Sequence, residues 1–335
     1  MILKTRVFSL ALLLAIAVIA PGILKAQDAQ PMSETPLGTA AAGSGSKTGG
    51  TAVEAIAPGD LSGGTVATAG PEAAAFDGTY VWVASQFTDS VTRIRVSDGL
   101  ITGTFAVGKR PVALLAAGGS VWVANLVSDN VMKLNPSTGA VTATYTAGDG
   151  PGGLAFDGTN VWVANREGNS VTKLSTAGAN LGTFAVGNRP MGVAVVGGAV
   201  FVVNNFSNSV TKLSLAGAVL GTYKVGRGPF GVAGQGENVW VTNYFDKTVT
   251  KLRASDGLNL GTFKVGDGAS GIVFDGTSMW VVSNGDNNVM KIAPSTGSVV
   301  STYATGKGPF AVVFDGAKIW VSNFASNSIS STAAN

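Results

Sequence analysis

The sequence predicts an all-β fold, a seven-bladed β-propeller with four antiparallel strands in each blade. Three observations indicate this fold: the composition, a repeat of about 40 residues, and four strand signals within each repeat. Hydrophobic residues make up 45% of the 335-residue chain, charged residues make up 12%, and there are 47 glycines. Many short buried strands joined by tight turns have such a composition, whereas long charged helices do not.

An aromatic residue inside a Val-rich triplet marks the repeat. It recurs every 39 or 40 residues, at Trp82, Trp122, Trp162, Phe201, Trp240, Trp280 and Trp320. Ser or Asn follows three positions after each aromatic residue, and Val or Ile follows nine positions after it. The chain therefore contains seven copies of one unit, and we expect the aromatic residues to pack between neighbouring blades.

Residues 150–187 show the four strand signals of one repeat. Apolar runs occupy 153–156, 160–164, 170–174 and 181–186. Asp157-Gly158, a strong hairpin dipeptide, separates the first two runs. The period alone also permits a β-solenoid, but hairpins between neighbouring short strands favour propeller blades.

The two ends of the repeat region predict how the ring closes. The seventh repeat, residues 308–332, ends after its third strand signal. A spare strand signal precedes the first repeat, because Gly64-Thr65-Val66-Ala67-Thr68 resembles Gly103-Thr104-Phe105-Ala106-Val107. We expect residues 64–68 to form the fourth strand of the last blade, so that the propeller spans residues 64–335 and its last sheet has no open edge.

The N-terminal region has the pattern of an export signal followed by a linker. Lys4 and Arg6 precede an uncharged, mostly apolar stretch from Val7 to Leu24, and Ala26 lies at a plausible cleavage site. We expect residues 1–26 to be a signal peptide, with an uncleaved membrane anchor as the alternative. Residues 27–63 are rich in Gly, Ala, Ser, Thr and Pro, which is typical of a disordered linker. The predicted protein is a monomer in the periplasm, at the cell surface or secreted.

Charge and missing residue types limit the functions. Residues 1–26 contain three of the 22 basic residues and no acidic residue, so the remainder has 19 basic against 19 acidic residues. A neutral mature chain has no global attraction to nucleic acid or anionic lipid. The chain has no Cys and no His, which excludes thiolate and imidazole metal sites, Cys nucleophiles and Ser-His-Asp triads. We expect no cofactor, no metal and, after cleavage, no membrane span.

The repeats resemble those of the YVTN family of β-propellers. Trp240-Val241-Thr242-Asn243 reads WVTN, and the other copies read WVAS, WVAN, WVAN, FVVN, WVVS and WVSN. The similarity extends through the N-S-V-T-K-L segments at 169–174 and 208–213 and through G-x-x-P turns. It implies propeller architecture and does not imply one function. Virginiamycin B lyases have similar repeats, but their catalytic His has no counterpart here.

Strand alternation assigns the loops to two faces of the propeller. The hairpin face carries Asp-Gly turns, which are typical structural turns, with a calcium-binding Asp ring as the alternative. The other face joins fourth to first strands and second to third strands, and its loop tips vary between repeats. Arg, Phe and Tyr are enriched at interface anchors. The candidate partner-binding residues on this face are Arg110, Arg166, Arg189, Arg227, Phe206, Tyr244, Phe245 and Lys307.

We interpret the chain as a non-catalytic binding or scaffold propeller whose partner is a protein, peptide, glycan or polymer. Replacing Arg166, Arg189 and Arg227 by Ala should abolish partner capture without lowering the melting temperature. One alternative is a lyase or lactonase that uses a divalent metal and carboxylates, with Asp149, Glu167, Asp246 and Asp267 as candidates. Another is binding of single-stranded nucleic acid, with Phe87, Phe206, Tyr244 and Phe245 as base-stacking residues.

Overall fold

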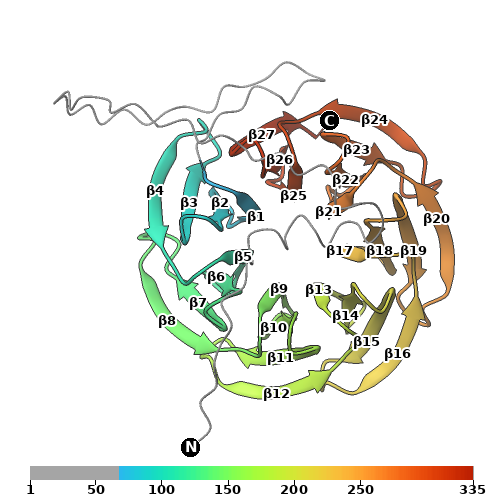
Figure 1. Cartoon of the computed structure of the whole chain (residues 1–335), viewed down its shortest axis with the longest axis horizontal. Helices are drawn as coiled ribbons and strands as arrows, with labels where there is room; N and C mark the ends of the chain where they lie inside the picture. Colours follow the sequence, from blue (N-terminus) through green and yellow to red (C-terminus); the bar gives the residue numbers. More distant parts are fainter. Residues whose placement is uncertain (1–67, 335) are drawn as a thin grey trace, which may run out of the picture. The chain divides into compact units, whose positions relative to one another are not determined.

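The computed structural model describes residues 68–334 as a ring of antiparallel sheets (Figure 1). This part of the chain forms 27 strands and contains no helix. Six sheets have four strands in chain order, and the seventh has three strands within the described residues. The predicted seven-bladed β-propeller is thereby confirmed, and blades 1 to 7 follow the order of the chain.

Each blade runs from the central channel outward (Figure 1). The first, innermost strands are β1 (Pro71–Phe76), β5 (Pro111–Ala117), β9 (Pro151–Phe156), β13 (Pro190–Val196), β17 (Pro229–Gln235), β21 (Ala269–Phe274) and β25 (Pro309–Phe314). The second strands are β2 (Tyr80–Ser85), β6 (Ser120–Asn125), β10 (Asn160–Asn165), β14 (Ala199–Asn204), β18 (Asn238–Asn243), β22 (Met279–Ser283) and β26 (Lys318–Asn323). The third strands are β3 (Ser90–Arg95), β7 (Asn130–Leu134), β11 (Ser170–Ser175), β15 (Ser209–Ser214), β19 (Thr248–Arg253), β23 (Asn288–Ile292) and β27 (Ser328–Ala333). The outer strands are β4 (Ile101–Ala106), β8 (Val141–Thr146), β12 (Asn180–Ala185), β16 (Val219–Lys224), β20 (Asn259–Lys264) and β24 (Val299–Ala304).

The four strand signals of residues 150–187 correspond to β9, β10, β11 and β12 within a few residues. The Asp157 carboxylate between β9 and β10 accepts the backbone N–H groups of Thr159 and Asn160 and also the Trp162 indole N–H, at 2.8 Å. The same Asp-to-indole hydrogen bond forms at Asp77, Asp275 and Asp315. The structural interpretation of the Asp-Gly turns is therefore confirmed.

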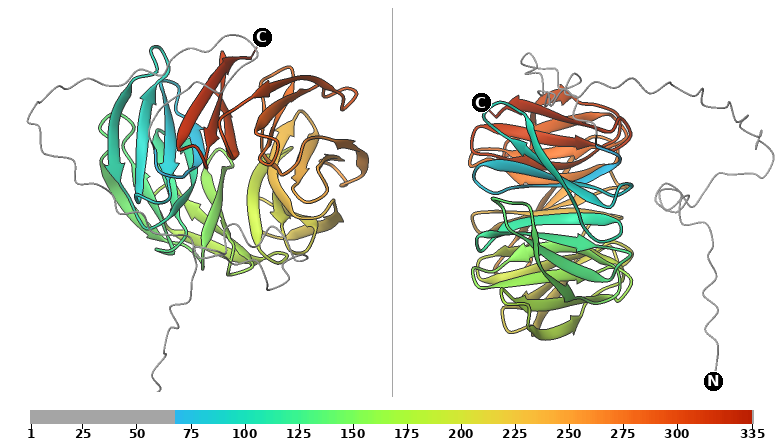
Figure 2. Two further views of the ribbon diagram at one scale, coloured as in Figure 1. Left: turned by 45° about the horizontal axis from the view of Figure 1, so that its top comes forward. Right: turned by 90° about the vertical axis from the view of Figure 1, so that its left-hand side faces the viewer.

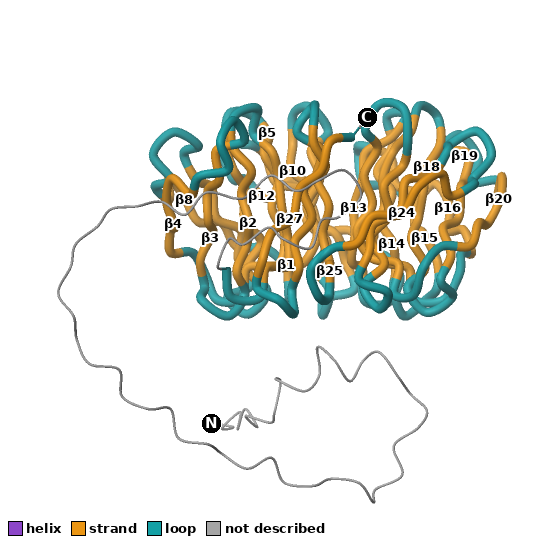
Figure 3. Tube along the Cα trace, turned by 90° about the horizontal axis from the view of Figure 1, so that it is seen from above, coloured by secondary structure: helices purple, strands orange, loops and turns teal. Residues whose placement is uncertain are grey.

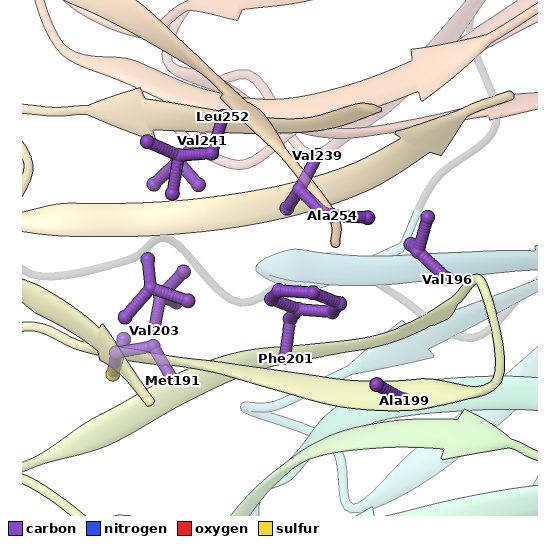
Figure 4. Packing of buried hydrophobic residues seen from close by; sticks show 10 residues of the cluster. Met191, Val196, Ala199, Phe201, Val203, Val239, Val241, Leu252 and Ala254 are labelled. Atoms are coloured by element: carbon purple, nitrogen blue, oxygen red, sulfur yellow. The ribbon is translucent and has the colours of Figure 1, made fainter. Parts of the chain in front are cut away.

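The core of the propeller lies between adjacent blades. All six Trp anchors and Phe201 are at most 1% exposed, which confirms their predicted packing role. Figure 4 shows Phe201 and Val203 of blade 4 facing Val239 and Val241 of blade 5. Because each sheet is covered on both faces, its second strand is apolar at consecutive positions rather than at alternate ones.

A basic residue on the third strand of each of blades 1 to 6 bridges to the next blade. Lys173, for example, donates to the Leu215 carbonyl at 2.7 Å while its ammonium lies 5.3 Å from the Trp162 ring centroid. The equivalent residues are Arg93, Lys133, Lys212, Lys251 and Lys291. Several positive charges of the chain are therefore part of the framework and are not available to a partner.

The blades are also joined by a side-chain hydrogen bond on the loop face. A left-handed Asp or Asn before the third strand accepts a backbone N–H from the loop that enters the next blade, as Asn169 does from Arg189 at 2.8 Å. Asn327 of blade 7 accepts from Gly70 at 2.8 Å and links the last blade to the first. Blade 5 has Lys247 at this position, and its ammonium pairs with Asp267 instead.

We expect Asn327→Ala to lower the free energy of unfolding by about 1–2 kcal/mol, because it removes the hydrogen bond to Gly70 and places Ala in a left-handed conformation (φ 53°). Lys247→Ala is the matched control, since it has the same backbone conformation (φ 57°) without that bond. Urea denaturation measures both variants, and an equal loss in the two would contradict the proposed role of the bond.

The expectations for residues 1–26 and 27–63, and for residues 64–67 of the predicted closing strand, lie outside the described residues. Thr68, the last residue of that strand, donates its backbone N–H to the Asn327 carbonyl at 3.3 Å. Within residues 68–334, no helix is long and apolar enough to cross a membrane. The views in Figure 2 show the ring of blades from two further directions.

Candidate functional site: the mouth of the central channel

The variable loops lie at one end of the central channel. Loops occupy both ends of the strands (Figure 3), and strand alternation places the loops from fourth to first and from second to third strands at the same end. The seven first strands together line a cavity of about 240 Å³. We call its opening at the variable-loop end the channel mouth.

A ring of seven equivalent residues surrounds the channel mouth. In every blade the innermost strand begins with a residue that is followed at once by a β-bulge, where its register with the second strand shifts. Such a bulge re-aims side chains. The second residues of the seven innermost strands, which lie at the bulge, are Glu72, Val112, Gly152, Met191, Phe230, Ser270 and Phe310. All of them except Ser270 line the cavity, so the ring varies in chemistry while the frame that holds it is constant.

Two arginines at the mouth have a left-handed backbone. Arg110 (φ 56°) and Arg189 (φ 52°) directly precede the first strands of blades 2 and 4. The other five blades have Gly at this position, also with positive φ: Gly70, Gly150, Gly228, Gly268 and Gly308. A left-handed residue that is not Gly, Asn or Asp costs about 1–2 kcal/mol, and such strain concentrates at functional sites.

Blade 3, between these two arginines, contributes a buried arginine. Arg166 follows β10, is 7% exposed, and lies across Gly152, where a Cβ atom would overlap its Nε. Its Nη2 lies 3.6 Å from Oε1 of Glu72, which is also 7% exposed. Within the described residues, neither Arg166 Nε nor Glu72 Oε2 has a hydrogen-bond partner. The pair is therefore buried and incompletely satisfied.

Burial and charge act against each other in this pair. Burial raises the pKa of Glu72 above its usual value, although the positive charges of Arg166 and Arg110 partly oppose the shift. Burial lowers the pKa of Arg166, and the charges of Arg189 and Arg110 lower it further, while Glu72 opposes this. The charges of Arg110 and Arg189 therefore act on Arg166, and we call these three arginines the cationic cluster. An added anion would stabilise this cluster.

The opposite side of the mouth is aromatic. Phe230 of blade 5 and Phe310 of blade 7 meet edge to face with ring centroids 5.0 Å apart. Phe324 lies 6.3 Å from Phe310, and Phe87 lies 5.4 Å from Phe324. Phe310 lies on β25, which Figure 1 shows on the far side of the channel from β9, and Phe230 lies on β17. We call Phe230, Phe310, Phe324 and Phe87 the aromatic wall.

The structure separates the predicted candidates into two groups. Arg110, Arg166 and Arg189 come together, and exposed Phe206 lies under the Arg189 guanidinium, 4.8 Å from it. Arg227 is not part of this cluster, because its exposed guanidinium pairs with Asp246. The remaining candidates lie elsewhere in the loops: Tyr244, Phe245 and Lys307.

Tyr244 and Phe245 have structural contacts in blade 5. The Tyr244 hydroxyl donates to Asn284 at 3.2 Å, its ring meets that of Phe245 edge to face at 5.5 Å, and burial raises its pKa. Phe245 lies over Gly228, while Lys307 is exposed at its loop tip. These three residues do not line the cavity, and of the three arginines only Arg166 does.

Burial of Arg166 changes the expectation for its replacement. An exposed loop arginine would tolerate Ala, but removal of Arg166 leaves the buried Glu72 carboxylate without its counter-charge. We therefore expect Arg166→Ala to lower the melting temperature, contrary to the expectation from the sequence, and Arg110 and Arg189 are the better sites for testing binding.

The candidate carboxylates do not assemble into a metal site in the described part of the chain. No three Asp, Glu, His or Cys side chains there are close enough to hold a metal ion. Asp246 is engaged by Arg227 and Asp267 by Lys247. The geometry therefore gives no support to carboxylate-metal catalysis by these residues.

The fold and site define a seven-bladed β-propeller with a cationic channel mouth. No family model and no curated protein match the chain. Among solved structures, a streptogramin B lyase superposes with a TM-score of 0.70 at 17% identity, covering 80% of this chain and 94% of the lyase. Virginiamycin B lyase from Staphylococcus aureus gives 0.70 at 17%, covering 79% and 95%. Hydrazine synthase from Kuenenia stuttgartiensis gives 0.72 at 18%, covering 84% and 99%.

These neighbours confirm the fold, and a YVTN-type repeat propeller fits them. At such low identity the likeness concerns architecture alone. The structural neighbours include lyases and a hydrazine synthase, so function depends on the residues placed on the shared frame.

Proposed function

We propose that the protein is an exported, non-catalytic binding propeller that holds its partner at the channel mouth. One observation carries the proposal: Arg110 and Arg189 occupy left-handed positions where the other five blades have Gly. Both flank the buried Arg166. Glycine would be less strained at both positions. The Arg110 guanidinium donates to Gln86 Oε1 at 2.9 Å, and the Arg189 guanidinium lies over the Phe206 ring. These contacts hold the two guanidinium groups at the loop face at a cost in backbone strain, which is typical of functional sites.

The surroundings of the cluster support binding rather than framework. The framework arginine and lysines of the third strands donate to carbonyl groups of the next blade. Arg166 Nε, by contrast, has no hydrogen-bond partner in the described residues. A pocket with a few converging polar groups in an otherwise apolar lining is the usual form of a ligand site.

The double variant Arg110→Gly/Arg189→Gly tests this function. We expect it to lose partner affinity by about tenfold or more, because hydrogen bonds to charged groups contribute about 1.5–3 kcal/mol each. The free energy of unfolding should change by less than about 1 kcal/mol per site, since relief of backbone strain offsets the flexibility of Gly. Methyl NMR of Met191 and Val112, both in the cavity wall, measures binding of anionic, neutral and cationic small molecules.

The matched control is Arg227→Ala, which removes an exposed loop arginine outside the cluster. The proposal holds if some compounds shift the cavity methyl signals saturably in the wild type and in the control but bind weakly to the double variant. It fails if no compound class shifts these signals, or if the double variant binds as well as the wild type.

A further inference from the structure

The channel mouth has two chemically different sides. Arg166 of blade 3 lines the cavity on one side, and Arg110 and Arg189 directly precede the first strands of the neighbouring blades 2 and 4. Phe230 and Phe310, from blades 5 and 7, line the cavity on the other side. A ligand that satisfies both sides carries a negative charge at one end and an apolar, flat body at the other.

The net charge of the cluster limits the charge of the ligand. Glu72 neutralises part of the positive charge of the three arginines, and its buried position leaves its Oε2 without a partner. A highly charged anion would be repelled by this carboxylate. A single oxyanion instead fits the planar donors of arginine, which bind carboxylates and phosphates in a bidentate manner.

The size and lining of the cavity indicate a small organic molecule. Its volume is about 240 Å³, below the usual range of about 300–1,000 Å³ for drug-sized ligands. Below the ring, the wall is apolar and includes Leu114, Leu154, Val232 and Ile272. The apolar side chains of this wall favour burial of an apolar body, and the polar groups beside them are backbone groups of the innermost strands, which pair on one side only.

We infer that the ligand is a small monoanionic organic acid with an aromatic body. This inference rests on the proposed function and specifies its ligand. The oxyanion binds between Arg110, Arg166 and Arg189. The aromatic body lies against Phe230 and Phe310, whose edge-to-face arrangement leaves ring surface at the cavity.

Titrations of the full chain with defined probes test the inference. The probes are 3-phenylpropionate, phenyl phosphate, acetate, inorganic phosphate, 3-phenylpropanol and 3-phenylpropylamine, each followed by calorimetry and by the methyl signals of Met191 and Val112. We expect 3-phenylpropionate to bind at least about tenfold more tightly than acetate, which lacks the aromatic body, and at least about tenfold more tightly than 3-phenylpropanol, which lacks the negative charge. Its affinity should fall as salt is raised.

Two variants separate the two sides of the site. Arg110→Gly/Arg189→Gly should reduce the affinity for 3-phenylpropionate to that of 3-phenylpropanol, and Phe230→Leu should reduce it toward that of acetate. Phenyl phosphate is largely dianionic at neutral pH, so its binding more tightly than 3-phenylpropionate would overturn the monoanionic charge of the ligand. Equal affinity for acetate and 3-phenylpropionate would overturn the aromatic body.

Failure of the inference differs from failure of the proposed function. If 3-phenylpropanol or 3-phenylpropylamine binds at the channel methyl groups while the acids do not, the ligand class is wrong and the binding site stands. If none of the probes shifts the methyl signals of Met191 or Val112, while broader panels also leave them unchanged, the proposed function itself is wrong.

Discussion

Arg166→Ala is expected to lower the free energy of unfolding by about 3–5 kcal/mol, because it removes one partner of a buried ion pair and leaves the other uncompensated. Glu72 is 7% exposed and, within residues 68–334, its Oε2 has no alternative hydrogen-bond donor. For a domain of this size we expect the melting temperature to fall by roughly 10 °C. Urea denaturation and calorimetry measure the loss.

The double variant Glu72→Met/Arg166→Met provides the decisive comparison. Replacing both members of a buried pair by apolar residues is often neutral or stabilising, so this variant should lie within about 2 kcal/mol of the wild type. If the double variant is as unstable as Arg166→Ala, the packing of the arginine side chain and not its charge accounts for the loss. Arg227→Ala, at an exposed position, should change stability by less than about 0.5 kcal/mol.

The loss in Arg166→Ala should also depend on pH. Burial holds the pKa of Glu72 above its usual value, so the native state binds this proton more tightly than the unfolded state. The contribution of Glu72 is therefore favourable at low pH and is lost as pH rises through the native pKa. Without Arg166 this effect is larger, so the deficit relative to the wild type should be small in acid and grow toward neutral pH. A deficit independent of pH would contradict this electrostatic origin.

The periodicity of the sequence predicted the blades because every blade packs the same kinds of side chains at the same positions against its neighbours. Trp162 and its equivalents fill the same space between sheets, and Asp157-Gly158 forms the same turn wherever it occurs. The predicted strands of residues 150–187 therefore agree with β9 to β12 within a few residues. Local rules of alternation and turn chemistry are sufficient for this level of structure.

The candidate site was only partly predictable, because it depends on which blades are neighbours. The sequence identified Arg110, Arg166 and Arg189 as varied residues at loop tips, but it gave Arg227 the same weight. In blade 5 the left-handed residue before the first strand is Gly228. Arg227 precedes it by one residue, and its guanidinium pairs with Asp246. Aligning the repeats at the residue before the first strand separates these cases, since Arg110 and Arg189 replace Gly there.

Glu72, Gly152, Phe230 and Phe310 were missed entirely as site residues. Each directly follows the first residue of its first strand, where the bulge brings it to the channel mouth. Their repeat position varies from acidic to apolar to Gly while its neighbours hardly change. That contrast was available in the sequence, but burial of Glu72 against Arg166 depends on three-dimensional contacts between blades 1 and 3.

The basic residues of the third strands were also assigned no role from the sequence. Lys173 and Lys251 each reach a carbonyl of the following blade more than 40 residues away. The sequence shows their regular spacing, but it does not show that their ammonium groups lie over Trp162 and Trp240. Such long side chains cover apolar surface while their charged ends find partners elsewhere.

Deletion of residues 27–69 is expected to destabilise the propeller strongly, whereas deletion of residues 27–60 should leave its stability nearly unchanged. In the described residues, β27 pairs with β26 alone, although the third strands of the other six blades pair on both sides. The predicted strand at residues 64–68 would complete this sheet. The shorter deletion removes only residues that the composition assigns to a linker.

The size of the expected loss follows from hydrogen bonds and burial. Each ladder hydrogen bond contributes about 0.5–1.5 kcal/mol, and the predicted strand would also bury the Val66 side chain, which is worth about 1.5–3 kcal/mol. Several such bonds together amount to a large part of the roughly 5–15 kcal/mol of a typical domain. The deletion also removes Thr68, whose N–H donates to the Asn327 carbonyl at the junction of blades 7 and 1.

Thermal melting and light scattering of the two deletion variants test this closure. The longer deletion should melt well below the shorter one and should aggregate, because it exposes the edge of β27. Adding a synthetic peptide of residues 61–70 in excess should restore part of the lost melting temperature, since a strand that binds the native state stabilises it by mass action. Equal melting curves for the two deletions would show that residues 64–68 do not complete the last blade, and the ring would then close through Asn327 and Gly70 without a fourth strand.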